Sequence, residues 1–81
     1  MEHYRLYVSD GKSPTTTNIF CFEAEDDDKA VEKVFANKEE YFKDIKKNYF
    51  LSQAVLINDK TERLSRRIVT RFANGEFVEL L

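Results

Sequence analysis

The chain has a single cysteine, Cys21, and a single histidine, His3, among its 81 residues. One cysteine allows no internal disulfide, and small secreted domains usually depend on disulfides for their stability. The sequence therefore favours a cytoplasmic protein. One cysteine and one histidine also exclude a Cys/His zinc cluster built within the chain, so we expect no structural metal and no other cofactor.

Glycine and proline are almost as scarce, with Gly11, Gly75 and Pro14 as the only examples. No glycine-rich loop of the kind that holds phosphate groups can be built from them. A Ser-His-acid triad would have to use His3, near the chain end, where catalytic geometry is hard to hold. The usual signatures of hydrolytic, phosphoryl-transfer and dinucleotide chemistry are missing, and we expect a protein that is not an enzyme.

Long hydrophobic stretches are absent as well. Apolar runs are no longer than four residues, as in Ala54–Ile57, which is too short to span a bilayer, and the first residues do not resemble a signal peptide. The 13 basic and 15 acidic side chains leave a net charge of −2, with 42% hydrophobic residues. This balance excludes a uniformly cationic nucleic-acid coat and an anionic DNA mimic, and it is typical of one small globular domain over residues 1–81.

The first half of the sequence predicts two strands followed by a helix. Apolar and polar residues alternate over 4–9 and 18–24, and the polar loop between them completes a hairpin. Asp26 or Asp27 then provides an N-cap, and apolar residues recur at helical spacing from Val31 to Ile45. We expect the helix to end near residues 46–48, with Asn37 as a point where it could divide.

The second half predicts three more strands. Residues 50–57 are apolar on both faces, which is typical of a central strand. Residues 65–72 and 77–81 follow, joined by Asn74-Gly75, a pair that favours a type I′ hairpin turn. The predicted fold is a single α+β domain in which an antiparallel sheet of four to five strands, in ββαβββ order, carries one helix on one face.

One helix can cover only one face of such a sheet, and several apolar side chains are predicted on the other face. These are Tyr7, Ile19, Cys21, Val69, Val78 and Leu80. They are exposed, weakly covered by loops, or buried in a partner, and either a homodimer through the open face or a hetero-interface would bury them.

The acidic segment 23–28 is a second candidate surface. It lacks the central glycine and terminal glutamate of a calcium-binding loop. Asp26, Asp27 and Asp28 could instead dock a basic surface of a partner. The alternative is a helix N-terminus that carries more acidic residues than capping requires.

Between Lys46 and Arg71 the sequence holds seven basic side chains against two acidic ones. Arg67 and Arg71 are predicted on the same face as Val69, and Arg66 on the opposite face with Ile68. Such a strand could follow the phosphates of a nucleic acid, with Lys46, Lys47, Arg63, Arg67 and Arg71 as the contacts. The alternative is a solvated outer face whose charges guard an edge strand.

We expect a small non-catalytic, protein-binding or regulatory module, an adaptor or inhibitor of the kind that phages and other mobile elements often carry. It would bind an unidentified protein, or a second copy of itself, and would not associate with a membrane. The candidate contact residues are Tyr7, Asp26, Asp27, Asp28, Val69 and Val78. The alternative function is nucleic-acid binding through the basic segment 46–71.

Overall fold

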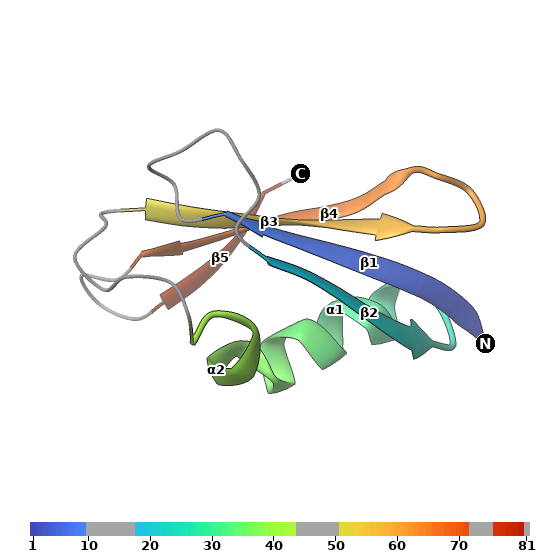
Figure 1. The fold of residues 1–81 in the computed structure, drawn as a ribbon, viewed down its shortest axis with the longest axis horizontal. Coiled ribbons are helices and arrows are strands. Elements are labelled where there is room, and N and C mark those ends of the chain that lie inside the picture. The colour runs from blue at the N-terminus through green and yellow to red at the C-terminus, as the bar shows by residue number, and fades with distance from the viewer. Residues whose placement is uncertain (10–17, 44–50, 72–75, 81) are drawn as a thin grey trace.

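The computed structural model describes residues 1–9, 18–43, 51–71 and 76–80. Within them the elements are β1 (Glu2–Ser9), β2 (Asn18–Ala24), α1 (Asp27–Ala36), α2 (Lys38–Tyr41), β3 (Leu51–Asn58), β4 (Leu64–Arg71) and β5 (Glu76–Leu80). The strands form one antiparallel sheet in the order β2-β1-β3-β4-β5, and both helices lie on one side of it (Figure 1). The expectation of a single antiparallel sheet with helical cover on one face is confirmed.

The predicted ββαβββ order is not matched in full, because the helical segment divides at Asn37. The backbone N–H and the side-chain amide of Asn37 both donate to the carbonyl of Lys33, at 3.1 and 2.8 Å, and this ends α1. The Asn37 carbonyl then accepts the N–H of Tyr41 at 3.1 Å and begins the short α2. The predicted helix end at 46–48, the first hairpin loop and the Asn74-Gly75 turn lie outside the described residues.

The strand register places the core on β1 and β3 rather than on β2. Leu6 of β1 lies opposite Phe20 of β2 on one side and Leu56 of β3 on the other. The fully buried apolar side chains between the sheet and the helices include Tyr4, Leu6, Val8, Leu56 and Ile68 of the sheet and Ala30 and Val34 of α1. Phe20 and Phe22 of β2 are only half-buried and pack on the rim of this core.

Among the described residues no helix is long and apolar enough to cross a bilayer. The sheet instead has two different faces. Its helix-facing side is covered by α1 and α2, whereas no helix of the described chain lies on the other side (Figure 1).

Ser52 provides a test of the core. It is fully buried on the helix-facing side of β3, and its hydroxyl has no hydrogen-bond partner among the described residues. Since an unpaired buried hydroxyl costs about 1–3 kcal/mol, Ser52→Ala should raise the free energy of unfolding by about 1 kcal/mol in urea denaturation. Ser9→Ala is the control, because the half-exposed Ser9 hydroxyl donates to the Gln53 carbonyl at 3.4 Å, and it should give no gain. A loss of stability in Ser52→Ala would contradict this description of the core.

Candidate functional site

The first candidate site forms where α1 begins. Asp26 has extended backbone angles, with φ −155° and ψ 179°, and its carboxylate accepts the N–H of Lys29 at 2.8 Å. It is therefore the N-cap of α1, as the sequence predicts for Asp26 or Asp27. Asp27 and Asp28 occupy the first turn, where their charges favour the positive end of the helix dipole.

A partly buried hydrogen-bond network connects this helix start to the sheet. The Tyr4 ring is fully buried, and its hydroxyl lies 2.7 Å from Asp27 Oδ1 and 3.0 Å from Glu2 Oε2. A phenol has one proton to donate, so it cannot satisfy both carboxylates by itself. The remaining donor is the side-chain amide of Asn58, which lies 2.9 Å from the Glu2 oxygen and 3.3 Å from the Asp27 oxygen.

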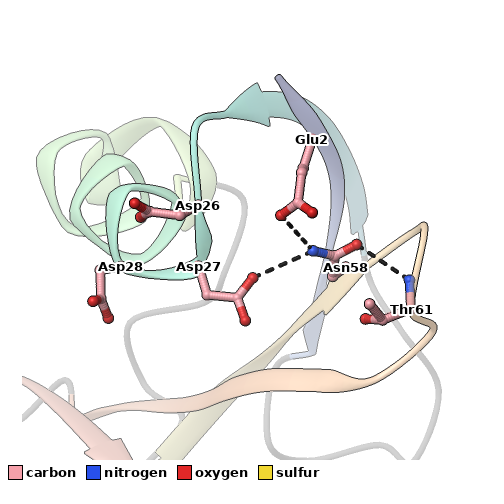
Figure 2. Close-up of a pocket in the computed structure, with 6 residues that line it drawn as sticks. All are labelled: Glu2, Asp26, Asp27, Asp28, Asn58 and Thr61. Atoms are coloured by element: carbon pink, nitrogen blue, oxygen red, sulfur yellow. Dashed lines mark hydrogen bonds between the residues drawn. The ribbon is translucent and has the colours of Figure 1, made fainter.

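The orientation of the Asn58 amide is fixed by the turn that follows β3. Its Oδ1 accepts the backbone N–H groups of Lys60 and Thr61, at 2.9 and 3.3 Å, so its NH₂ group must face the two carboxylates. Figure 2 shows Asn58 between Glu2 and Asp27, with Thr61 on its other side. Together with Asp26 and Asp28 these residues line a cavity of about 420 Å³, which we call the acidic cleft.

The acidic cleft keeps the Tyr4 phenol neutral. Burial raises the pKa of this phenol above its ordinary value, and the hydrogen bonds to Asp27 and Glu2 raise it further. A phenolate at this position would also be repelled by both carboxylates. The Tyr4 hydroxyl therefore keeps the one proton that it donates within the network, and the Asn58 amide is the donor for the other carboxylate.

The three aspartates differ in what they are free to do. Asp26 caps α1 and Asp27 binds Tyr4 and Asn58, so both carboxylates have roles within the fold. The Asp28 side chain is 87% exposed and lies 3.7 Å from the guanidinium of Arg66, which also pairs with Glu79 of β5. In the described part of the chain, no group of three or more His, Cys, Asp or Glu side chains is arranged to hold a metal ion.

The second candidate site is the side of the sheet opposite the helices. Its register creates three rows of side chains across the strands, and together these rows define the open sheet face: Ile19-Tyr7-Val55-Arg67-Leu80, Cys21-Arg5-Ile57-Leu64 and Gln53-Val69-Val78. Ile19, Leu64 and Leu80 are 55%, 41% and 47% exposed, whereas Val55 and Ile57 are half-buried.

The structure brings Tyr7, Val69 and Val78 onto this face, as predicted, but they differ in access. Tyr7 is half-buried, and its hydroxyl accepts a hydrogen bond from Arg5 at 2.7 Å. Val69 lies opposite Val78 and is only 6% exposed, whereas Val78 is half-buried. The aspartates of the acidic cleft are on the helix side of the sheet, so the two predicted contact surfaces do not form one continuous patch.

The basic residues also separate between the faces. Arg67 is exposed on the open sheet face between Val55 and Leu80, whereas Arg66 points to the helix side, as the alternation predicts. Arg63 lies exposed in the connection between β3 and β4. Lys46, Lys47 and the side chain of Arg71 lie outside the described residues.

Sequence reasoning missed Glu2, Asn58 and Thr61, which complete the acidic cleft, and Tyr4, which is hydrogen-bonded to two of its carboxylates. The alternation of β1 does place Glu2 on the same face as Tyr4, and Asn58 continues the helix-facing series of Leu56 and Ala54. A polar residue in that series was the available signal. Their convergence depends on the pairing of β1 with β3, in which Tyr4 lies opposite Asn58.

The chain matches no family model, no curated protein and no solved structure. We therefore infer its function from the acidic cleft and the open sheet face.

Tyr4→Phe tests the network at the acidic cleft. Removing the hydroxyl should lower the free energy of unfolding by about 1–2 kcal/mol at neutral pH. Because the folded protein raises the pKa of Tyr4 above the ordinary 10.0, the phenol stabilises the fold below pH 10, and this contribution is lost as the pH rises further.

Alkaline denaturation of Tyr4→Phe should therefore be less steep than that of the wild type. Burial, and then the charge of Glu40, also raises the pKa of Tyr41, so some steepness should remain in the variant. Tyr7→Phe, which removes a hydroxyl from the open sheet face, is the matched control. Equal alkaline slopes for wild type and Tyr4→Phe would refute the role assigned to Tyr4.

Asn58→Asp tests the electrostatics of the same network. The change keeps the size of the side chain but places a third carboxylate beside Glu2 and Asp27, and it should cost about 2–3 kcal/mol at pH 7. The two neighbouring charges raise the pKa of the new carboxyl, so its penalty is greatest at neutral pH and shrinks as the pH falls toward about 4. Asn58→Ala should show a deficit that changes little over that range. Parallel pH profiles for the two variants, measured by thermal unfolding, would contradict this electrostatic account.

Proposed function

We propose that the protein is a non-catalytic protein-binding module, an adaptor or inhibitor, that captures a protein partner through its open sheet face. The observation that supports this proposal is the apolar character of a sheet face on which no described helix packs. Ile19, Leu64 and Leu80 are exposed there around the half-buried Tyr7 and Val55. Exposed apolar side chains on a sheet face without helical cover are common at interfaces.

The polar residues of the open sheet face suit the same role. Tyrosine and arginine are enriched at protein interfaces, because each combines apolar contact area with hydrogen-bonding groups. Tyr7 and Arg5 are already held together, with the guanidinium 5.6 Å from the ring centroid and Arg5 paired to Asp59. A partner would therefore meet a partly ordered contact surface and would lose less side-chain entropy on binding.

In this proposal the acidic cleft has a secondary role. Asp26 and Asp27 are engaged within the fold, so Asp28 is the member of the acidic segment that could meet a basic group of a partner. It lies on the helix side of the sheet, so one partner would have to extend around the end of the sheet to contact both surfaces. We assign the main binding energy to the open sheet face.

Nucleic-acid binding is the second candidate, because Arg5, Tyr7 and Arg67 share the open sheet face. Basic side chains beside an aromatic ring are suited to phosphates and bases of a single strand. The face has more apolar than basic side chains among the described residues, and this favours a protein partner.

The proposal is tested by capture from a lysate of the source cells, with half of the lysate treated with nuclease. The wild-type protein is compared with Leu64→Asp/Leu80→Asp, which places two charges on the open sheet face at exposed positions. Ala36→Asp makes the same kind of change at an exposed position of α1 and serves as the control. We expect a stoichiometric protein partner that resists nuclease, is retained by the control, and binds the double variant at least about tenfold more weakly.

Two results would contradict the proposal. Capture that is equal for the wild type and the double variant would show that the open sheet face is not the binding surface. Capture that disappears after nuclease treatment and weakens steeply with salt would favour the nucleic-acid alternative.

A further inference from the structure

The direction of the backbone groups along β2 can be derived from two contacts. The carbonyl of His3 accepts the N–H of Asp59, which follows β3, at 2.9 Å, so the backbone groups of His3 point toward β3. Glu23 lies opposite His3 in the register of β1 and β2. In an antiparallel pair, two residues that lie opposite each other direct their backbone groups either both toward each other or both away from each other. Those of His3 point away from β2, so those of Glu23 point away from β1. The backbone groups of Glu23 therefore point to the free edge of the sheet.

A side chain of α1 supports this assignment independently. The ammonium of Lys33 donates to the carbonyl of Glu23 at 3.3 Å, as is expected of a carbonyl that points away from β1. Because the direction alternates along a strand and β1 and β2 pair without a register shift, Ile19 and Cys21 also direct their N–H and C=O groups to the free edge. In the described part of the chain no strand lies beyond β2 (Figure 1).

The two edges of the sheet are protected differently. β5 is the shorter edge strand and carries Glu79. By the same alternation, the backbone N–H and C=O groups of Glu79 point to the free edge of β5, and its side chain pairs with Arg66. Charged residues and short length are the usual devices that prevent edge strands from pairing with other chains. The segment from Asn18 to Phe22 has no charged residue and no proline. Lys33 covers only the end of β2 at Glu23.

We propose that a second copy of this chain adds to the free edge of β2, antiparallel and about a two-fold axis at Phe20, so that the two sheets become continuous. In this register Ile19 of one copy lies opposite Cys21 of the other, which forms about four main-chain hydrogen bonds. The contact between Lys33 and Glu23 falls outside the paired segment and is preserved.

The side chains of β2 favour a second copy as the occupant. A two-fold axis brings each side chain near its own counterpart, so a strand that carries charges would meet like charges. Across the proposed axis Ile19 meets Cys21 and Phe20 meets its own copy, and all of these are uncharged. The edge ladder is short and the interface is smaller than the roughly 1,200 Å² typical of stable complexes, so we expect a weak dimer that forms with rising concentration.

Sedimentation equilibrium between about 10 µM and about 1 mM tests the proposal, since weak interfaces associate in this range. Cys21→Pro removes the N–H that points to the free edge and leaves the pairing with β1 intact, so it should abolish the dimer. Cys21→Ser keeps that N–H and should dimerise like the wild type. A wild-type chain that is monomeric at every concentration, or a Cys21→Pro variant that dimerises normally, would overturn the proposal.

A crosslinking measurement does not depend on the folding of Cys21→Pro. In the proposed register the introduced thiol of Ile19→Cys faces Cys21 of the second copy at a Cα separation of about 5.5 Å, within the range of a disulfide. The two native Cys21 residues are about 8 Å apart, beyond that range. Mild oxidation should therefore yield covalent dimers of Ile19→Cys at least several-fold faster than of the wild type.

Equal rates of covalent dimerisation for Ile19→Cys and the wild type would refute the proposed register. A wild type that stays monomeric would contradict the dimer and would favour an extended segment of another protein as the strand that pairs with β2. The dimer does not require the proposed partner-binding role of the open sheet face. Leu64→Asp/Leu80→Asp should dimerise like the wild type even if it loses its partner, so failure of either proposal can be distinguished from failure of the other.

Discussion

The hydroxyl of Tyr4 is the polar group on which the arrangement of this fold depends. Its ring is fully buried under α1, so the hydroxyl must find partners inside the protein. It finds them where the start of α1 meets the end of β3, in Asp27 and in the carboxylate–amide pair of Glu2 and Asn58. This network holds the N-terminus of α1 against the sheet. Ala30, Val31 and Val34 are thereby directed onto the core of β1 and β3.

The exposed surfaces of the molecule follow from that constraint. With α1 held on one side, no helix of the described chain is left for the opposite side, and its apolar rows form the open sheet face. With β3 paired to the other side of β1, β2 becomes an edge strand whose outward backbone groups lie at Ile19 and Cys21. The same network explains why an acidic helix start that resembles a docking surface contributes mainly to the fold.

Local patterns predicted the elements of this fold well. Alternation, the apolar run of β3 and the hairpin signal before β5 predicted every described strand to within two residues, and alternation correctly separated Arg66 from Arg67 and Tyr7 from Leu6. The capping pattern placed the start of α1, and the low helix propensity of Asn37 marked the position where the helical segment divides. The order of strands in the sheet could not be predicted in this way, because it depends on contacts between distant segments. Glu2, Tyr4 and Asn58 therefore came together unforeseen, and the hydrogen bonds of Asp27 to Tyr4 and Asn58 could not be predicted.

The Tyr4 hydroxyl and the Asp27 carboxylate, 2.7 Å apart, stabilise the fold through direct contact. A double-mutant cycle of Tyr4→Phe and Asp27→Ala, measured by urea denaturation, tests it most directly. We predict a coupling free energy of about 1 kcal/mol or more, whereas Tyr4→Phe combined with Asp26→Ala should be additive, because Asp26 caps α1 and makes no hydrogen bond to Tyr4. Additive effects for Tyr4 and Asp27 would contradict the account.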